Sequence, residues 1–232
     1  MTINRIEVLQ DASGALLGAM KGNIVVIVDV INMSTTLEAA YDAGALGVFG
    51  ASPDDTRAPV FVNPEAIGYH AGKFARSHNS ELILVTEPRV GTDKERRKHA
   101  SRAISGIKKA GINPITVLPN LGAETVKLAD FKNKVVIAVT DSGGVAYDAA
   151  FNAGATVTTA TVARSLKKKG LDTVHDGVVR ALSIAPGNYK GISVVAASSN
   201  SLEDLLAANF IARYFAAYLE HNRNLFRRNY YS

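Results

Sequence analysis

Apolar runs and polar loops alternate along the whole chain, in the order typical of an α/β protein. Ile24–Val30 is continuous and rich in β-branched residues, which predicts a fully buried strand. A helix is predicted from Ser34 to Asp42, because Ser34 or Thr35 can serve as its N-cap and Gly44 follows its end. Further strands are predicted at 47–50, 59–62, 81–86, 115–118, 135–139, 157–160 and 193–197. Further helices are predicted at 64–76, 92–109, 122–129, 144–152, 162–169, 171–182 and 202–219.

One part of this pattern occurs twice. Residues 25–51 and 135–161 align without a gap at an offset of 110, and 8 of the 27 positions are identical. Each copy contains an apolar run, a polar loop, a helix ending in Ala-Gly-Ala and a second short apolar run. We therefore expect an α/β fold with three layers, α/β/α, built as a single compact domain from two related halves at about 1–120 and 121–232. The alternative explanation of the repeat is that Ala- and Val-rich units resemble each other through composition alone.

Composition narrows the class of protein. Hydrophobic residues make up 47% of the 232 positions, which is sufficient for a proper core, and the absence of Cys excludes disulfides and Cys-ligated metal. The opening MTINRIEVLQ lacks the apolar stretch of a signal peptide, and no run reaches the roughly 18 residues of a membrane helix. We expect a cytoplasmic protein with no membrane partner.

The net charge of +5 comes from clustered basic residues at 94–109, 167–169 and 223–228. These clusters lack interleaved aromatic residues and lie on predicted helix faces or ends, where Lys and Arg are ordinary surface residues. We therefore expect no nucleic-acid partner and favour a basic funnel for a small anion. The five histidines have no paired spacing, which argues against zinc.

The first candidate site follows the buried strand at 24–30. Asp29 ends this strand, and carboxylate oxygens are ligands that Mg²⁺ prefers. Ser34, Thr35 and Thr36 open the next helix, where hydroxyls and backbone N–H groups form a ready site for an anion. The alternative is structural, with Asp29 bonded to a loop and Ser34 serving only as a cap.

Two later loops occupy similar positions. Ser142, Gly143 and Gly144 follow the strand at 135–139, and paired glycines allow the backbone to approach a ligand closely. Glu203 and Asp204 open the last helix, where acidic residues also suit the helix dipole without any catalytic role. Each loop thus has a plain structural interpretation as a turn or a cap.

Together the three loops carry a resemblance. Asp-Val-x-x-x-Ser-Thr-Thr after a valine-rich strand, then Thr-x-Ser-Gly-Gly, then Ser-Leu-Glu-Asp-Leu-Leu-Ala-Ala, resembles the 2-phosphosulfolactate phosphatase family of coenzyme M biosynthesis. The resemblance covers residues 23–52 and 133–219. It implies two related α/β/α halves with the site between them, and Mg²⁺-dependent hydrolysis of a small, anionic phosphomonoester.

The resemblance also assigns roles to individual residues. Those implied to be catalytic are Asp29, Ser34, Thr35, Glu203 and Asp204. Those implied to hold Mg²⁺ are Asp29, Glu203 and Asp204. Those expected to contact the anion are Asn32, Thr36, Ser142, Gly143, Gly144 and Arg89.

The chain departs from the family pattern at important places. Asn32 stands where the family has an Arg, and an amide cannot clamp phosphate through a charged, bidentate contact. Arg89, which ends a predicted strand, is our candidate to replace that charge. The family's glycine-rich middle segments are not recognisable at 60–120. A non-catalytic anion-binding or regulatory protein on the same scaffold is therefore the alternative function. The apolar spacing along 202–219 indicates core or a dimer face, and we expect a homo-oligomer, most simply a dimer.

Overall fold

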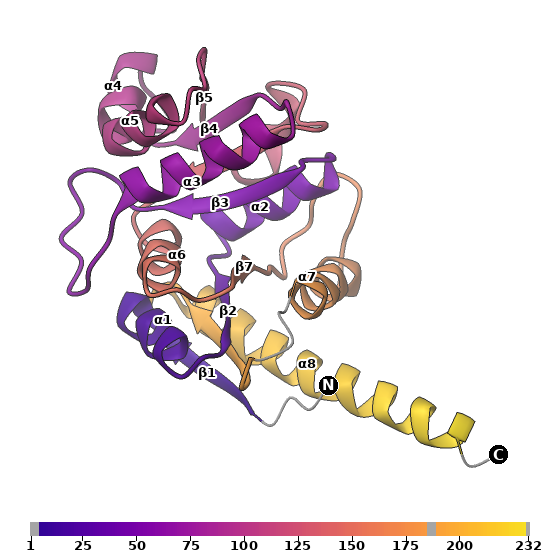
Figure 1. The fold of residues 1–232 in the computed structure, drawn as a ribbon. Helices are drawn as coiled ribbons and strands as arrows, with labels where there is room; N and C mark the ends of the chain where they lie inside the picture. The colour runs from indigo at the N-terminus through magenta and orange to yellow at the C-terminus, as the bar shows by residue number, and fades with distance from the viewer. Residues whose placement is uncertain (1–4, 185–188, 231–232) are drawn as a thin grey trace.

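The computed structural model describes residues 5–184 and 189–230, and the side chains of 223–230 lie outside the description. The first half of the chain contains β1 (Ile6–Gln10), α1 (Asp11–Met20), β2 (Ile24–Val28), α2 (Met33–Asp42), β3 (Gly47–Ala51), α3 (Pro64–Ser77), β4 (Leu82–Thr86), α4 (Asp93–His99), α5 (Ser101–Lys109) and β5 (Thr116–Pro119). The second half contains the 3₁₀ helix η1 (Gly122–Lys127), β6 (Val135–Val139), α6 (Gly143–Asn152), β7 (Val157–Thr159), α7 (Leu171–Ser183), β8 (Ile192–Ala196) and α8 (Leu202–Tyr230). Figure 1 shows these elements in chain order.

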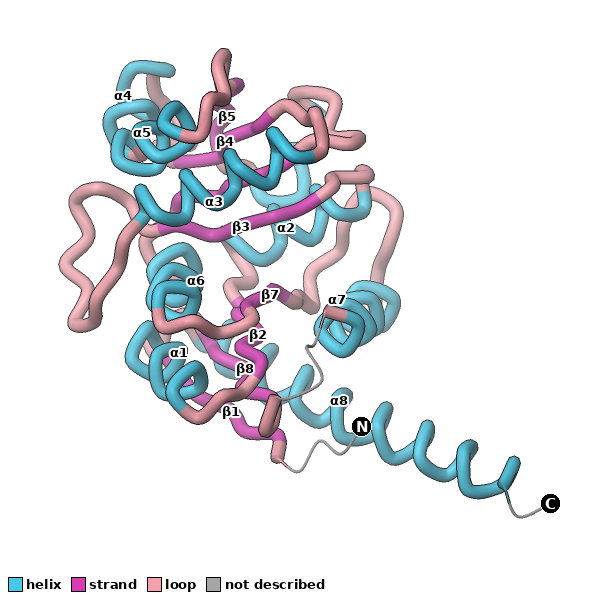
Figure 2. The backbone as a smooth tube through the Cα atoms, viewed as in Figure 1, coloured by secondary structure: helices cyan, strands magenta, loops and turns pink. Residues whose placement is uncertain are grey.

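The strands form two parallel sheets of four strands each (Figure 2). Sheet A has the order β1-β8-β2-β7, and sheet B has the order β3-β6-β4-β5. Helices α2 and α6 contact strands of both sheets and therefore lie between them. Helices α7 and α8 pack on sheet A, and α3 packs on sheet B. Each sheet is thus the middle of an α/β/α arrangement, and the expected α/β class is confirmed.

Strand β2 shows how side-chain alternation produces these layers. All five of its residues are buried. Val25 and Ile27 belong to the core that contains α2 and sheet B, whereas Ile24, Val26 and Val28 belong to the core beneath α7 and α8. Successive side chains of a strand point to opposite faces. A continuous run of Val and Ile is therefore required to fill two cores at once.

The topology is consistent with two related halves, as the 110-residue offset predicts. Strand β2 lies second from the β7 edge of sheet A, and β6 lies second from the β3 edge of sheet B. Helices α2 and α6 are offset by 110 residues, and so are β4 and β8. The first repeat runs from β2 in sheet A to β3 in sheet B, and the second runs from β6 in sheet B to β7 in sheet A. The two repeats therefore cross between the sheets. This crossing brings the loops after β2 and β6 to the middle of the molecule.

Several sequence predictions of local structure are wrong. Residues 59–62 form no strand, because Val60 and Val62 pack as a loop against Ala12, Val145 and Ala149. Residues 162–169 are a loop rather than a helix, and the helix predicted at 92–109 is interrupted at Ala100. The prediction missed β1 and α1 altogether. Within the described residues, no helix combines the length and the apolarity needed to cross a bilayer.

Helix α8 was expected to be core or a dimer face, and it divides between a packed and an exposed side. Ile211 and Phe215 are fully buried against sheet A. Leu202, Leu206 and Phe210 are exposed. The amphipathic spacing is thus explained by the core on one side, and the expected dimer stays a prediction.

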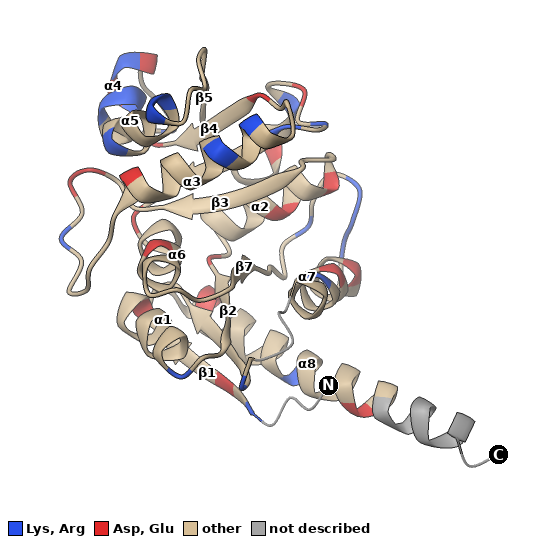
Figure 3. Ribbon diagram, in the orientation of Figure 1, with Lys and Arg blue, Asp and Glu red and all other residues tan. Residues whose placement is uncertain are grey.

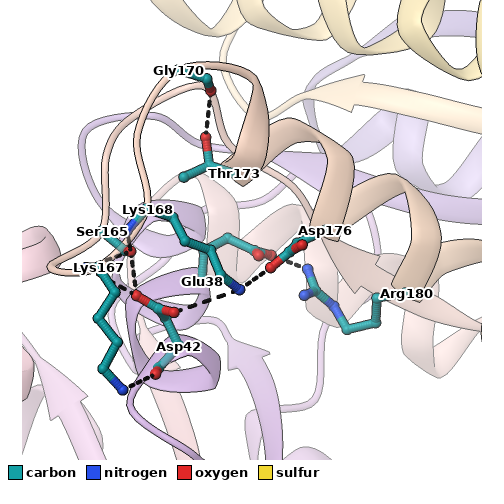
Figure 4. Close-up of polar contacts among 9 residues, drawn as sticks. All are labelled: Glu38, Asp42, Ser165, Lys167, Lys168, Gly170, Thr173, Asp176 and Arg180. Atoms are coloured by element: carbon teal, nitrogen blue, oxygen red, sulfur yellow. Dashed lines mark hydrogen bonds and ion pairs between the residues drawn. The ribbon is translucent and has the colours of Figure 1, made fainter.

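A network of charged side chains attaches α7 to α2 (Figure 4). Arg180 of α7 pairs with the buried carboxylate of Glu38 on α2, donates to the carbonyl of Thr159 (2.9 Å) and stacks over Tyr41 at 4.4 Å. Lys168, at the rim of the network, pairs with Asp42 and Asp176. The Lys168 and Asp176 side chains are both more than one-third exposed. The buried carboxylate of Glu38 therefore depends on Arg180 far more than the exposed carboxylate of Asp176 depends on Lys168.

We expect Arg180→Met to destabilise the protein by about 3–5 kcal/mol, because it leaves the buried Glu38 carboxylate without a positively charged partner and with only the hydroxyl of Thr159 as a donor (2.6 Å). Lys168→Met removes the exposed pair with Asp176, while Asp42 keeps its bonds from the hydroxyl of Ser165 and the N–H of Lys167, so the loss should be at most about 1 kcal/mol. Urea unfolding of both variants measures the difference, and the double variant Glu38→Gln/Arg180→Met should recover part of the loss. Equal losses from Arg180→Met and Lys168→Met would contradict this account.

Candidate functional site

Loops that follow three strands line a single cleft of about 240 Å³. The loop after β2 contributes Asp29, Ile31 and Asn32, and the loop after β6 contributes Ser142. The loop after β8 contributes Ser198, Asn200 and Ser201, and the first turn of α8 contributes Glu203 and Asp204. Strands β2 and β8 are neighbours in sheet A, whereas β6 belongs to sheet B. The cleft therefore lies where the carboxyl ends of the two sheets meet, the usual position of ligand sites in α/β proteins.

Asp29 lies at the bottom of this cleft and joins the two repeats. Its Oδ1 accepts the backbone N–H of Asn32 (3.0 Å), and its Oδ2 accepts the backbone N–H of Gly143 (2.9 Å). Burial raises the pKa of Asp29, although bonds from the backbone N–H groups of Asn32, Met33 and Gly143 and the charge of Arg89 act in the opposite direction. The carboxylate thus occupies the beginnings of α2 and α6, where the sequence predicted a bound anion.

The hydroxyls that open α2 are engaged inside the protein and do not line the cleft. Ser34 Oγ donates to the carbonyl of Ile27 (2.9 Å) and accepts the backbone N–H of Asp29 (2.9 Å). Thr35 Oγ1 donates to the carbonyl of Val30 (2.5 Å). Thr36 Oγ1 donates to Oδ1 of Asn120 (2.6 Å). These bonds hold the loop that carries Asp29 and Asn32, so the geometry supports a positioning role for all three hydroxyls.

Gly143 and Gly144 approach atoms of the protein itself. A Cβ atom at Gly143 would lie 2.4 Å from Oδ2 of Asp29, and one at Gly144 would lie 2.0 Å from the carbonyl oxygen of Ala51. The N–H of Gly144 donates to Thr140 Oγ1 (2.8 Å). The glycine pair is therefore required for the contact between the repeats, and both N–H groups already have acceptors.

Glu203 and Asp204 place two further carboxylates beside Asp29. Ser201 Oγ accepts the N–H of Asp204 (3.2 Å), and Asp204 Oδ1 accepts the N–H of Val30 (2.8 Å). Burial, helped by the charges of Asp29 and Glu203 and opposed by the bonds from Val30 and Ser201, raises the pKa of Asp204 to about 6. Glu203 is exposed at the rim. The three acids predicted to hold Mg²⁺ therefore border one cleft.

Arg89, in the loop after β4, does not line the cleft but contacts two residues that do, Ile31 and Asn32. Its Nη2 donates to Oδ1 of Asn32 (2.7 Å) and to the carbonyl of Ile31 (3.3 Å). The side chain is exposed. A guanidinium thus lies directly beside the position where the resemblance calls for an Arg. Most other basic residues of this half gather on α4 and α5, away from sheet A (Figure 3).

The donor set of the cleft fits a hard divalent cation. Carboxylate and amide oxygens from Asp29, Asn32, Glu203 and Asp204 border the space, and Mg²⁺ binds through oxygen ligands while retaining several waters. The charges of Asp29 and Glu203 contribute to the raised pKa of Asp204, and a bound cation would relieve that repulsion. Glu203 and Oδ2 of Asp204 are the natural ligands, because both oxygens of Asp29 already accept an N–H bond.

Sequence reasoning missed the cleft residue Ser198 and assigned no role to Asn200, although Asn200 lies in the third candidate loop. Their position after a buried strand was the available signal, because the carboxyl ends of neighbouring parallel strands share one edge.

A comparison of the chain with protein-family models, curated proteins and solved structures found no match. The residues of the cleft therefore carry the functional interpretation.

The raised pKa of Asp204 predicts a pH-dependent stability. The folded protein holds this proton more tightly than the unfolded chain, whose pKa is near 3.8, so the free energy of unfolding falls as pH rises from 3.8 to about 6. Asp204→Asn should remove this loss while keeping an acceptor for the N–H of Val30. The variant should therefore gain stability relative to the wild type between pH 4 and pH 7.

Urea unfolding of both proteins across this pH range tests the prediction. Glu203→Gln, at an exposed position, is the matched control and should show a smaller change. A difference between Asp204→Asn and the wild type that is the same at pH 4 and pH 7 would show that Asp204 does not carry the effect.

Proposed function

We propose that this chain is a Mg²⁺-dependent, phosphatase-like hydrolase that acts on a small anionic phosphomonoester. The observation that carries this proposal is the convergence of Asp29, Glu203 and Asp204 on one cleft, with Arg89 at the same loop. Three carboxylates without a cation repel a phosphate, whereas a bound dication makes the same cleft attractive to it. The resemblance to the 2-phosphosulfolactate phosphatases supports the same chemistry.

Each residue of the cleft has a role in this proposal. Glu203 and Asp204 hold Mg²⁺, which when bound polarises a phosphoryl oxygen. Asp29 shapes the cleft by fixing the loops that carry Asn32 and Ser142. Arg89 binds the anionic substrate, and its bond to Asn32 (2.7 Å) orients the guanidinium. The charge that the family places at the position of Asn32 thus comes from another loop.

A non-catalytic anion-binding or regulatory protein is the second candidate, and one observation favours it. The N–H groups of Gly143 and Gly144 are engaged by Asp29 and Thr140, so they are not available to stabilise a transferring phosphoryl group. Both functions require the cation, but only the first predicts turnover. We place either function in the cytoplasm, in keeping with the absence of Cys.

We expect hydrolysis of p-nitrophenyl phosphate or 2-phosphosulfolactate that requires Mg²⁺ and stops with EDTA. Glu203→Gln removes a metal ligand and Arg89→Ala removes the anion contact, so each should lower kcat/KM by about 10- to 100-fold. Steady-state phosphate release, measured at several Mg²⁺ concentrations, checks both expectations. Glu203→Gln should in addition raise the Mg²⁺ concentration that gives half-maximal activity.

Two exposed residues of α8 provide matched controls. Glu220→Gln and Arg213→Ala remove the same charges elsewhere and should leave the kinetics unchanged. Mg²⁺-dependent binding of phosphate without turnover would favour the regulatory function. Hydrolysis that persists in EDTA, or that is equally fast in Glu203→Gln and Glu220→Gln, would refute the proposal.

A further inference from the structure

A second group of polar side chains gathers at the carboxyl edge of sheet B. Asp55 lies in the loop after β3, Asp141 follows β6, and His99 ends α4. Their ligand atoms all lie within 4.8 Å of one another. Strands β3, β6 and β4 are neighbours in sheet B, and His99 bonds to Thr86, the last residue of β4. The group therefore draws on the ends of three adjacent strands.

The hydrogen bonds of His99 determine which of its nitrogens is free. Thr86 Oγ1 donates its single proton to the carbonyl of Val139 (3.2 Å), so it accepts the bond from Nδ1–H of His99 (2.9 Å). Nε2 then carries a lone pair. This nitrogen faces Oδ1 of Asp55 at 3.9 Å, which is too long for a hydrogen bond. A histidine held through one nitrogen, with the other directed at carboxylates, is the arrangement typical of a metal ligand.

The loop that carries Asp55 is fixed beside His99 through its neighbour. The N–H of Asp54 donates to the carbonyl of His99 (3.0 Å). The side chain of Asp54 accepts the N–H of Arg102 (3.0 Å) and the hydroxyl of Ser101. Asp55 itself is largely exposed. Its carboxylate is therefore brought to His99 by bonds that do not use the carboxylate.

Glu87 adds a buried oxygen without a hydrogen-bond partner near this group, although it is not one of the three grouped ligands. It follows Thr86 directly, and Asp141 lies close enough for its charge to act on the Glu87 carboxylate. Its Oε1 accepts a bond from Asn120 (3.1 Å), whereas its Oε2 is buried with no hydrogen-bond partner in the described part of the chain. A buried acceptor without a donor is costly unless a cation or a water satisfies it.

We propose that Asp55, His99 and Asp141 bind a first-row transition-metal dication, with Zn²⁺ as the reference ion. One imidazole and two carboxylates suit Zn²⁺ and its neighbours, whereas Mg²⁺ takes oxygen ligands. Tetrahedral zinc bonds of about 2.0–2.2 Å place donor atoms roughly 3.4 Å apart, so small rotations of the two exposed aspartates bring the 3.9 Å pair and the remaining atoms, all within 4.8 Å, to the ion. Three protein ligands leave a position for a water or a substrate oxygen.

This metal site is independent of the proposed hydrolase activity. It uses residues outside the set proposed to hold Mg²⁺, and it predicts binding whether or not the chain hydrolyses phosphate. Asp141 precedes the cleft residue Ser142, so the bound ion would lie beside the cleft. Its ligands come from two loops and the end of α4, three segments far apart in the sequence, which explains why no local histidine spacing indicated it.

Calorimetric titration of chelator-treated full-length protein with Zn²⁺ tests the proposal, and titration with Mg²⁺ provides the comparison. We expect one equivalent of Zn²⁺ to bind, and Asp55→Asn to weaken this binding at least 10-fold. Asp55 is largely exposed, so this variant keeps the fold. Asp172→Asn, at an exposed position at the start of α7, is the matched control and should bind as the wild type does.

Two further variants test the role of His99. Thr86→Val removes the partner of Nδ1, together with the bond from Thr86 to the carbonyl of Val139, and should weaken binding by about 10- to 100-fold. His99→Asn should abolish the single-equivalent site, whereas His221→Asn, on the exposed surface of α8, should not. Absence of saturable Zn²⁺ binding by the wild type would overturn the proposal. Equal affinity in Asp55→Asn and Asp172→Asn would overturn it as well, since the ion would then be bound at other surface residues.

Discussion

The contact between the Asp29 carboxylate and the backbone at Gly143 is the constraint on which the rest of the structure depends. It joins the beginning of α6 to the loop that opens α2 (2.9 Å), and these two helices lie between the sheets. The approach is so close that a single added Cβ at Gly143 would lie 2.4 Å from Oδ2 of Asp29 and 2.8 Å from Cβ of Met33. How the strand ends of the two sheets meet, and hence the shape of the cleft, follows from this contact.

The same contact determines the chemistry that the cleft can support. The beginning of a helix attracts anions, and here an internal carboxylate already occupies two such positions. What faces the open space is a set of acids, with Arg89 bonded to Asn32 at its edge. A cation is therefore needed before an anionic substrate can bind. This order of events distinguishes the proposed hydrolase from an ordinary phosphate site at a helix N-terminus.

The sequence allowed the fold class and the cleft loops to be predicted because both depend on local patterns. Continuous Val and Ile runs mark buried parallel strands, and polar residues directly after them share one edge of a sheet. Strand β1 was missed because its residues are only half-buried or exposed at a sheet edge. The direction of the Ser34 hydroxyl, and the meeting of Asp55 with His99, depend on tertiary contacts between distant segments, for which the sequence contains no spacing signal.

Urea unfolding of Gly143→Ala tests the central contact most directly. At an unhindered helical position, Ala in place of Gly stabilises a protein by about 0.5–1 kcal/mol. Here we expect the opposite sign, a loss of about 1–3 kcal/mol, because the new methyl group displaces the carboxylate of Asp29 or the start of α2. A variant that is as stable as the wild type, or more stable, would show that the two repeats are not held together at this point.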